Sequence, residues 1–139
     1  MAKADFDRDG DVDLIITNYK DRAHYYVNKV AKGHWLQIRL RGRQSNRDGV
    51  GSIIRIRARD DRQMRVISAG DGYASQFSRV AHFGLGENEV IEELEVLWPS
   101  GKKQLFEGVL ADQMIEIDED ATKARVIMAR KTASSPSGR

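Results

Sequence analysis

The sequence contains no cysteine, and only two of its 139 residues are proline. Without cysteine the chain forms no disulfide bond and binds no metal through thiolates. No apolar run approaches the roughly 20 residues of a membrane-spanning helix. The first residues show no basic region followed by an apolar stretch, so no signal peptide is predicted. Two settings stay open: the chain is cytoplasmic, or it is a piece of a longer secreted protein.

The composition is that of one soluble globular domain, since 40% of the residues are hydrophobic and 32% are charged. The formal net charge is only +2, but the charges are unevenly placed. Residues 34–65 contain nine arginines against three aspartates, whereas residues 87–95 and 116–120 are mostly acidic. A basic segment of this kind attracts anions, or it forms one half of a salt-bridged sheet.

A helical pattern of ten or more residues is also missing, and alternation with a period of two dominates instead. Apolar and polar residues alternate through residues 36–41 and 54–59, and again in shorter runs separated by turn residues. Strands at this spacing predict an all-β fold, an antiparallel β-sandwich or a barrel-like module. From about residue 122 the alternation fades. We expect residues 122–139 to form a disordered tail. The alternative for residues 125–128 is that they add an edge strand to the sheet.

The most specific feature is an acidic run near the start. A carboxylate occupies every second position, at Asp5, Asp7, Asp9, Asp11 and Asp13, and Gly10 lies among them. Ca²⁺ prefers six to eight oxygen ligands, and a tight turn through glycine brings alternating side chains together. We therefore predict a calcium site made by these five residues, with Asp11 contributing its backbone carbonyl. The alternative is an acidic turn without metal.

This loop is not an EF-hand. An EF-hand loop requires a glutamate at its twelfth position, where this sequence has Ile16, and helices on both sides. Residues 14–18 read as a strand instead, and with residues 24–28 they predict a β-hairpin.

Two groups of motifs resemble known families. Residues 4–18 with Tyr25, Tyr26 and Asn28 resemble an FG-GAP (VCBS-type) propeller repeat. Further along, the segments 45–51, 70–76, 82–86 and 98–101, with Trp35 and Leu36 before them, resemble the ASPIC/UnbV domain. The resemblance covers about residues 4–117. It implies a partial calcium-loop repeat over residues 1–30, an ASPIC/UnbV-like β domain over residues 31–121, and an extracellular or envelope setting.

Two further groups are candidate binding residues. The glycine-framed segment with Asp71, Tyr73, Ser75 and Gln76 is a candidate ligand contact, because rigid scaffolds often present function on such loops; its glycines also fit a simple turn. The polar faces of two strands expected to be neighbours carry four arginines, namely Arg39, Arg41, Arg55 and Arg57. They predict either a cross-strand charge ladder with nearby glutamates or a patch for nucleic acid or acidic glycan. Nucleic acid is disfavoured, because no aromatic residues alternate with these arginines.

Catalysis is not predicted. There is no nucleophile elbow, the three histidines lack zinc spacing, and Glu92 and Glu93 point to opposite faces of a strand. The sequence instead predicts a non-catalytic, calcium-binding β module for adhesion or for carbohydrate or protein contacts, with an anion-binding module as the alternative. The unpaired N-terminal strands predict a homodimer.

Overall fold

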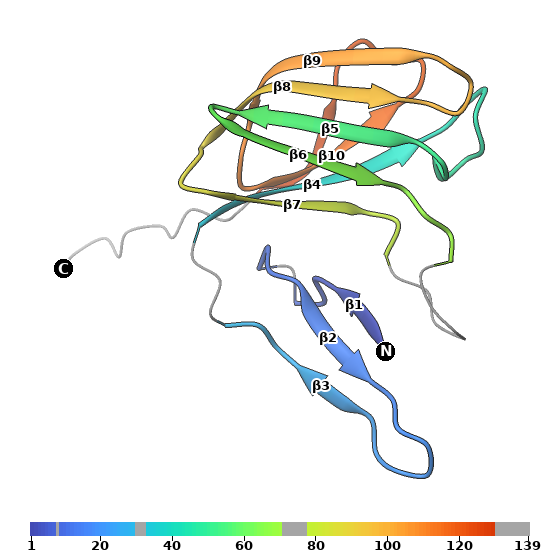
Figure 1. Ribbon diagram of the computed structural model, residues 1–139, viewed down its shortest axis with the longest axis vertical. Coiled ribbons are helices and arrows are strands. Elements are labelled where there is room, and N and C mark those ends of the chain that lie inside the picture. The colour runs from blue at the N-terminus through green and yellow to red at the C-terminus, as the bar shows by residue number, and fades with distance from the viewer. Residues whose placement is uncertain (8, 30–32, 71–77, 130–139) are drawn as a thin grey trace, which may run out of the picture.

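The computed structural model describes residues 1–7, 9–29, 33–70 and 78–129, and within these ranges the chain is all-β, as predicted. Figure 1 shows a sandwich of two sheets with a smaller sheet beside it. The strands are β1 (Ala2–Ala4), β2 (Asp13–Ile16), β3 (His24–Tyr26), β4 (His34–Arg41), β5 (Ile53–Ala58), β6 (Asp61–Val66), β7 (Ala81–Gly86), β8 (Val90–Leu97), β9 (Lys103–Leu110), β10 (Gln113–Asp118) and β11 (Arg125–Ala129). Among the described residues, no helix could cross a membrane.

The sandwich consists of two four-stranded sheets. One has the order β6-β5-β8-β9 and is antiparallel throughout. The other has the order β11-β10-β4-β7, and its central pair, β10 and β4, is parallel. The predicted antiparallel sandwich is confirmed as the fold class, and this parallel pair is a detail that the prediction did not include. A parallel pair requires a long crossover, and here the chain leaves β4, builds the opposite sheet and β7, and only then returns as β10.

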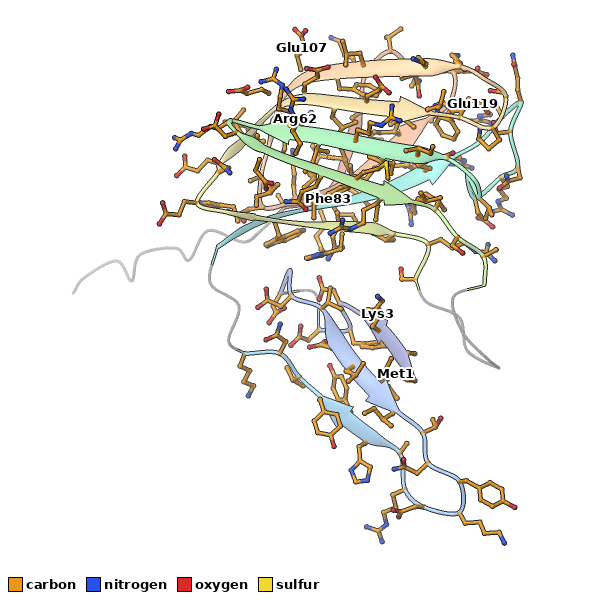
Figure 2. All side chains as sticks on the ribbon, viewed as in Figure 1. Met1, Lys3, Arg62, Phe83, Glu107 and Glu119 are labelled. Carbon is orange, nitrogen blue, oxygen red and sulfur yellow. The ribbon has the colours of Figure 1, made fainter. Side chains whose placement is uncertain are left out.

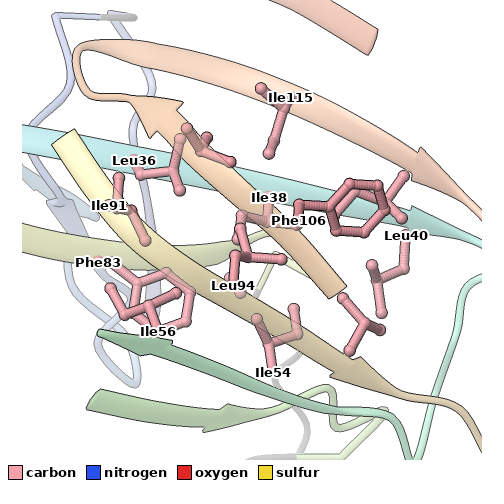
Figure 3. Packing of buried hydrophobic residues seen from close by; sticks show 14 of the residues in the cluster. Leu36, Ile38, Leu40, Ile54, Ile56, Phe83, Ile91, Leu94, Phe106 and Ile115 are labelled. Atoms are coloured by element: carbon pink, nitrogen blue, oxygen red, sulfur yellow. The ribbon is translucent and has the colours of Figure 1, made fainter. Parts of the chain in front are cut away.

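The core lies between these two sheets and consists of the apolar residues of the alternating strands. Leu36, Ile38 and Leu40 of β4 face Ile54 and other residues of the opposite sheet, and all are almost fully buried (Figure 3). Each such side chain contributes about 1.5–3 kcal/mol through removal of its apolar surface from water. The alternation therefore determines which face of each strand points inward.

The N-terminal unit is a three-stranded sheet with the order β1-β2-β3, rather than the hairpin that was expected. The predicted pair forms, with Leu14 opposite Tyr26 and Ile16 opposite His24. The additional strand β1 pairs with the other edge of β2, and it places Ala4 opposite Asp13. This small sheet lies beside the sandwich, on the side of β4 and β7 (Figure 1).

Residues 125–129 form β11, which pairs with β10 at the edge of its sheet. The assignment of these residues to a disordered tail is therefore wrong, and the edge-strand alternative holds. The physical reason is local: Met128 pairs opposite Met114, and Arg125 binds the Glu116 carboxylate with a distance of 2.6 Å from Nη2 to Oε1. Residues 130–139, the rest of the predicted tail, lie outside the described residues.

Candidate metal centre

Three carboxylates of the acidic run converge between β1 and β2. One ligand oxygen from each of Asp5, Asp7 and Asp13 lies within 4.8 Å of the other two. Asp5 directly follows β1 and Asp13 begins β2, so the pairing of Ala4 with Asp13 closes the loop and brings both ends of the run together. The local strand pairing therefore creates the cluster.

Asp9 and Asp11 lie in the same loop but are not part of this group of three. Asp9 Oδ1 accepts a hydrogen bond of 2.9 Å from the Asp11 backbone amide, which holds the turn. A ligand role for Asp9 and for the Asp11 carbonyl stays a prediction.

Gly10 lies at the tip of the loop, and two features of its position favour glycine. Its φ of +102° is a conformation that residues with a side chain rarely adopt. A Cβ atom added there would lie 2.0 Å from Nε1 of Trp35, so the indole occupies the space of a side chain. The glycine therefore permits both the turn and the close contact with β4.

Two polar side chains of the sandwich hold the loop. Gln37 of β4 donates a hydrogen bond of 2.7 Å from Nε2 to Asp5 Oδ2, which also accepts one of 3.1 Å from the Gly10 amide. His82 of β7 is 2.7 Å from the Gly10 carbonyl through Nε2. Gln37 and His82 are directly opposite each other in the ladder between β4 and β7. The acidic cluster is thus anchored to the sandwich at two neighbouring points.

Sequence reasoning missed both Gln37 and His82. Gln37 occupies a polar position of its strand and reads as a solvent-facing residue, yet it is only 6% exposed. The small sheet covers it. The alternation of polar and apolar residues in β4 does not indicate that the small sheet lies against this face.

The hydrogen bonds around Asp13 favour its ionised form. Burial opposes ionisation, but the donors Asn28 N, at 2.9 Å, and Phe6 N, at 3.1 Å, together with the Tyr25 hydroxyl, outweigh burial and lower the pKa of the Asp13 carboxyl. Desolvation, followed by the charges of Asp9 and Asp13, raises the pKa of the Asp7 carboxyl. A bound cation would offset the repulsion between the Asp7 carboxylate and those of Asp9 and Asp13.

Asp5 provides a further indication of a cation. Its Oδ1 atom is buried, and among the described residues no donor reaches it. A buried carboxylate oxygen without a partner is costly, and a cation would satisfy it. The cluster offers oxygen ligands only, which suits Ca²⁺ better than zinc.

The arginines of the predicted patch are paired with acids. β4 and β5 lie in opposite sheets, so the expectation that they are neighbours is wrong. Within each sheet the cross-strand partners are acidic: Arg39 opposite Glu116, Arg41 opposite Asp118, Arg55 opposite Glu95 and Arg57 opposite Glu93. Arg39 Nη2 is 2.8 Å from Glu116 Oε2, and Arg55 Nη1 is 2.8 Å from Glu95 Oε1. This favours the charge ladder, and anion binding by these arginines stays a prediction.

The candidate ligand residues Asp71, Tyr73, Ser75 and Gln76 lie outside the described residues. Their role as ligand contacts also stays a prediction.

Comparison with known proteins identifies the family of this chain. Its residues 42–124 match the family model described as ASPIC and UnbV. It is 32% identical to cartilage acidic protein 1 of Xenopus tropicalis over 105 residues, which cover 73% of this chain and 16% of that protein. The same-named protein of Mus musculus is 30% identical over 119 residues, 83% of this chain and 18% of the relative. The chain thus spans less than a fifth of the length of these curated relatives. The match over most of the sandwich confirms the resemblance predicted for this part of the sequence, and the chain belongs to the ASPIC and UnbV family.

Proposed function

We propose that this protein is a non-catalytic β module that binds Ca²⁺ through its N-terminal loop and contacts a protein or carbohydrate ligand. The observation that carries the proposal is the convergence of Asp5, Asp7 and Asp13 within 4.8 Å. The buried Oδ1 of Asp5, which no donor among the described residues reaches, supports it. Asp9 and the Asp11 carbonyl would complete the six or more oxygens that Ca²⁺ prefers.

The N-terminal unit supports the proposal that residues 1–30 are a partial FG-GAP repeat. Its acidic loop lies directly before β2, and β3 pairs with β2. The partner residues of Asp13 also lie within this unit: Phe6, Tyr25 and Asn28 all donate to its carboxylate. The metal would therefore fix the position of β2 relative to the start of the repeat.

We place the protein outside the cell or in the envelope. Its curated relatives carry the name cartilage acidic protein 1, and cartilage is a tissue rich in extracellular matrix. Calcium sites of extracellular modules have dissociation constants of roughly 10⁻⁴–10⁻³ M, and a partly exposed loop with few fixed ligands suits this range. Calcium in such a setting would hold the small sheet against the sandwich, through Asp5 and Gln37.

Isothermal titration of metal-free protein with Ca²⁺ tests the proposal. We expect saturable heat in the millimolar range or below, and a loss of that heat in Asp5→Asn and Asp13→Asn. Asp21→Asn is the matched control, since Asp21 is exposed in the same unit, accepts a hydrogen bond from the amide of its neighbour Arg22, and is not part of the acidic cluster. Absence of heat at millimolar calcium would contradict the proposal, as would equal loss in all three variants.

A further inference from the structure

We propose that the cavity between the small sheet and the sandwich binds an acidic peptide in which a carboxylate neighbours an apolar side chain. The cavity has a volume of about 670 Å³, and β1, β4, β6, β7, β10 and β11 all contribute to its walls. Pockets that hold small ligands measure about 300–1,000 Å³, so a few residues of a peptide fit. The inference extends the proposed function, because it assigns a partner chemistry to the module.

The charged residues of the cavity are mainly cationic. Lys3, Arg39, Arg65 and Arg79 contribute to the lining, and Asp5 is the sole carboxylate among the described lining residues. Figure 2 shows Lys3 on the small sheet, on the side that faces the sandwich. Arg39 is held by Glu116 at 2.8 Å, and Arg79 forms an ion pair with Asp48. Arg39 and Arg79 are therefore neutralised by neighbouring carboxylates.

Arg65 differs from these two arginines. Its Nη1 donates 2.9 Å to the Met64 carbonyl, and its guanidinium carbon lies 5.2 Å from the centre of the Phe83 ring. Among the described residues no carboxylate pairs with it. Contact with an aromatic ring orients a guanidinium while its remaining donors stay free for a carboxylate. Arg65 is therefore the residue best placed to bind an anion.

The other lining residues include a large apolar group: Val12, Val66, Val80, Met114, Ile127 and Met128. Methionine adapts its shape to different apolar partners, and two methionines lie side by side here, because Met114 is opposite Met128 in the ladder. An acidic glycan would satisfy the cations but would leave this apolar wall unused. A peptide with an acidic and an apolar side chain uses both, so charge and apolar surface together favour a peptide.

The cavity also shares Asp5 with the metal cluster. Ca²⁺ on Asp5 would neutralise the carboxylate that opposes an incoming anion. Binding of the peptide is therefore expected to be stronger with calcium than with a chelator, which links the two sites.

The test selects from a display library of short random peptides on the wild-type protein in calcium. We expect the enriched peptides to combine Asp or Glu with apolar residues. One enriched peptide is then synthesised and titrated against Arg65→Gln and Arg47→Gln. Arg47 is exposed in the loop after β4 and is not part of the cavity lining, so it is the matched charge control. We expect about a tenfold loss of affinity in Arg65→Gln, the effect of one charge-assisted hydrogen bond, and no loss in the control.

Calcium titration of the same variants separates this inference from the proposed function. Arg65 is not in the metal cluster, so both variants should bind Ca²⁺ like the wild type, which also shows that they fold. The inference is overturned by the absence of enriched peptides, by enriched peptides without acidic residues, or by equal affinity in the two variants. Binding of a heparin oligosaccharide that depends on Arg65, with no peptide enriched, would assign the cavity to glycans instead.

Discussion

The side-chain amide of Gln37 donates a hydrogen bond of 2.7 Å to Asp5 Oδ2, and so joins the sandwich to the acidic loop. The other carboxylate oxygen of Asp5 accepts from no donor in the part of the chain that the structure describes. Gln37 therefore orients a proposed metal ligand, and it would do so without contacting the metal itself. Residues of this kind affect metal affinity, because the ligand must otherwise be ordered when the metal binds.

We expect Gln37→Leu to weaken calcium binding by about tenfold, the lower end of the effect of removing such a partner. Leucine fits the buried position but offers no donor. Calorimetric titration measures the effect, and Gln44→Leu is the control, because the Gln44 side chain is exposed in the loop after β4. If Gln37→Leu binds calcium as tightly as the control, the loop is oriented without the sandwich.

The contact between Gly10 and Trp35 leads to a second prediction. An alanine at position 10 would adopt an unfavourable positive φ and would also overlap the indole. The φ alone costs about 1–2 kcal/mol, and the overlap adds to it. We expect Gly10→Ala to lower the free energy of unfolding by more than this and to weaken calcium binding.

Gly101→Ala separates the two effects. Gly101 has a φ of +88°, but no atom of the described residues lies within 4 Å of an added Cβ atom, so we expect its substitution to carry only the conformational cost. Urea denaturation of both variants gives the comparison. Equal destabilisation would mean that the loop moves away from Trp35 at little cost.

A third prediction concerns Glu119, which sequence reasoning did not single out. This glutamate is fully buried at the end of the sandwich, and Figure 2 labels it there. Its Oε2 accepts from the backbone amides of Arg43, Gln44 and Ser45, and its Oε1 accepts from the hydroxyls of Ser45 and Ser100. One carboxylate thus joins two loops. In the sequence it follows Asp118 and precedes Asp120, and it looks like a solvent-exposed acid.

Protonation of Glu119 should destabilise the fold in acid. Burial raises the pKa of its carboxyl, but the hydrogen bonds from Ser100, Arg43 and Ser45 outweigh burial and lower this pKa from 4.5 to about 2. A depressed pKa stabilises the folded state above the unfolded value, by roughly 3 kcal/mol here. This contribution is complete above about pH 4.5 and is lost as the pH falls toward 2.

Glu119→Gln should therefore lower the free energy of unfolding at neutral pH by about 3 kcal/mol and should flatten its decline between pH 4.5 and 2. Denaturation curves at several pH values measure both effects. Glu107→Gln is the control, because Glu107 is exposed on β9 (Figure 2). An unchanged slope in Glu119→Gln would assign the acid sensitivity to other carboxylates.

Local patterns were enough to predict most strands of the sandwich but not their partners. The alternation through residues 36–41 and 54–59 predicted β4 and β5, because burial of one face requires it. The same pattern could not show that these strands lie in opposite sheets, since that depends on the crossover to β10. The short β1 was missed because its sequence, Ala-Lys-Ala, has little strand preference of its own.

The acidic loop was predictable for a different reason. Its carboxylate spacing places the ends of the run near each other as soon as the chain turns at Gly10, so the convergence of Asp5 and Asp13 needs only local structure. Gln37 and His82 reach the same loop from residues far along the chain, and only the docking of the small sheet brings them there.

The last prediction concerns association through the small sheet. β3 is an edge strand, and Tyr25, Tyr26 and Val27 at this edge are 49%, 54% and 37% exposed. Unpaired backbone groups beside exposed apolar side chains favour pairing with another strand. We therefore expect a homodimer that forms through these N-terminal strands, seen by light scattering as a mass that rises with concentration.

Tyr26→Lys should shift this dimer to the monomer, because a lysine on an edge strand opposes pairing. Tyr19→Lys is the control, since Tyr19 is 89% exposed in the turn before β3 and outside the strand. A monomer at every concentration, or dimers in both variants, would show that this edge is not the interface.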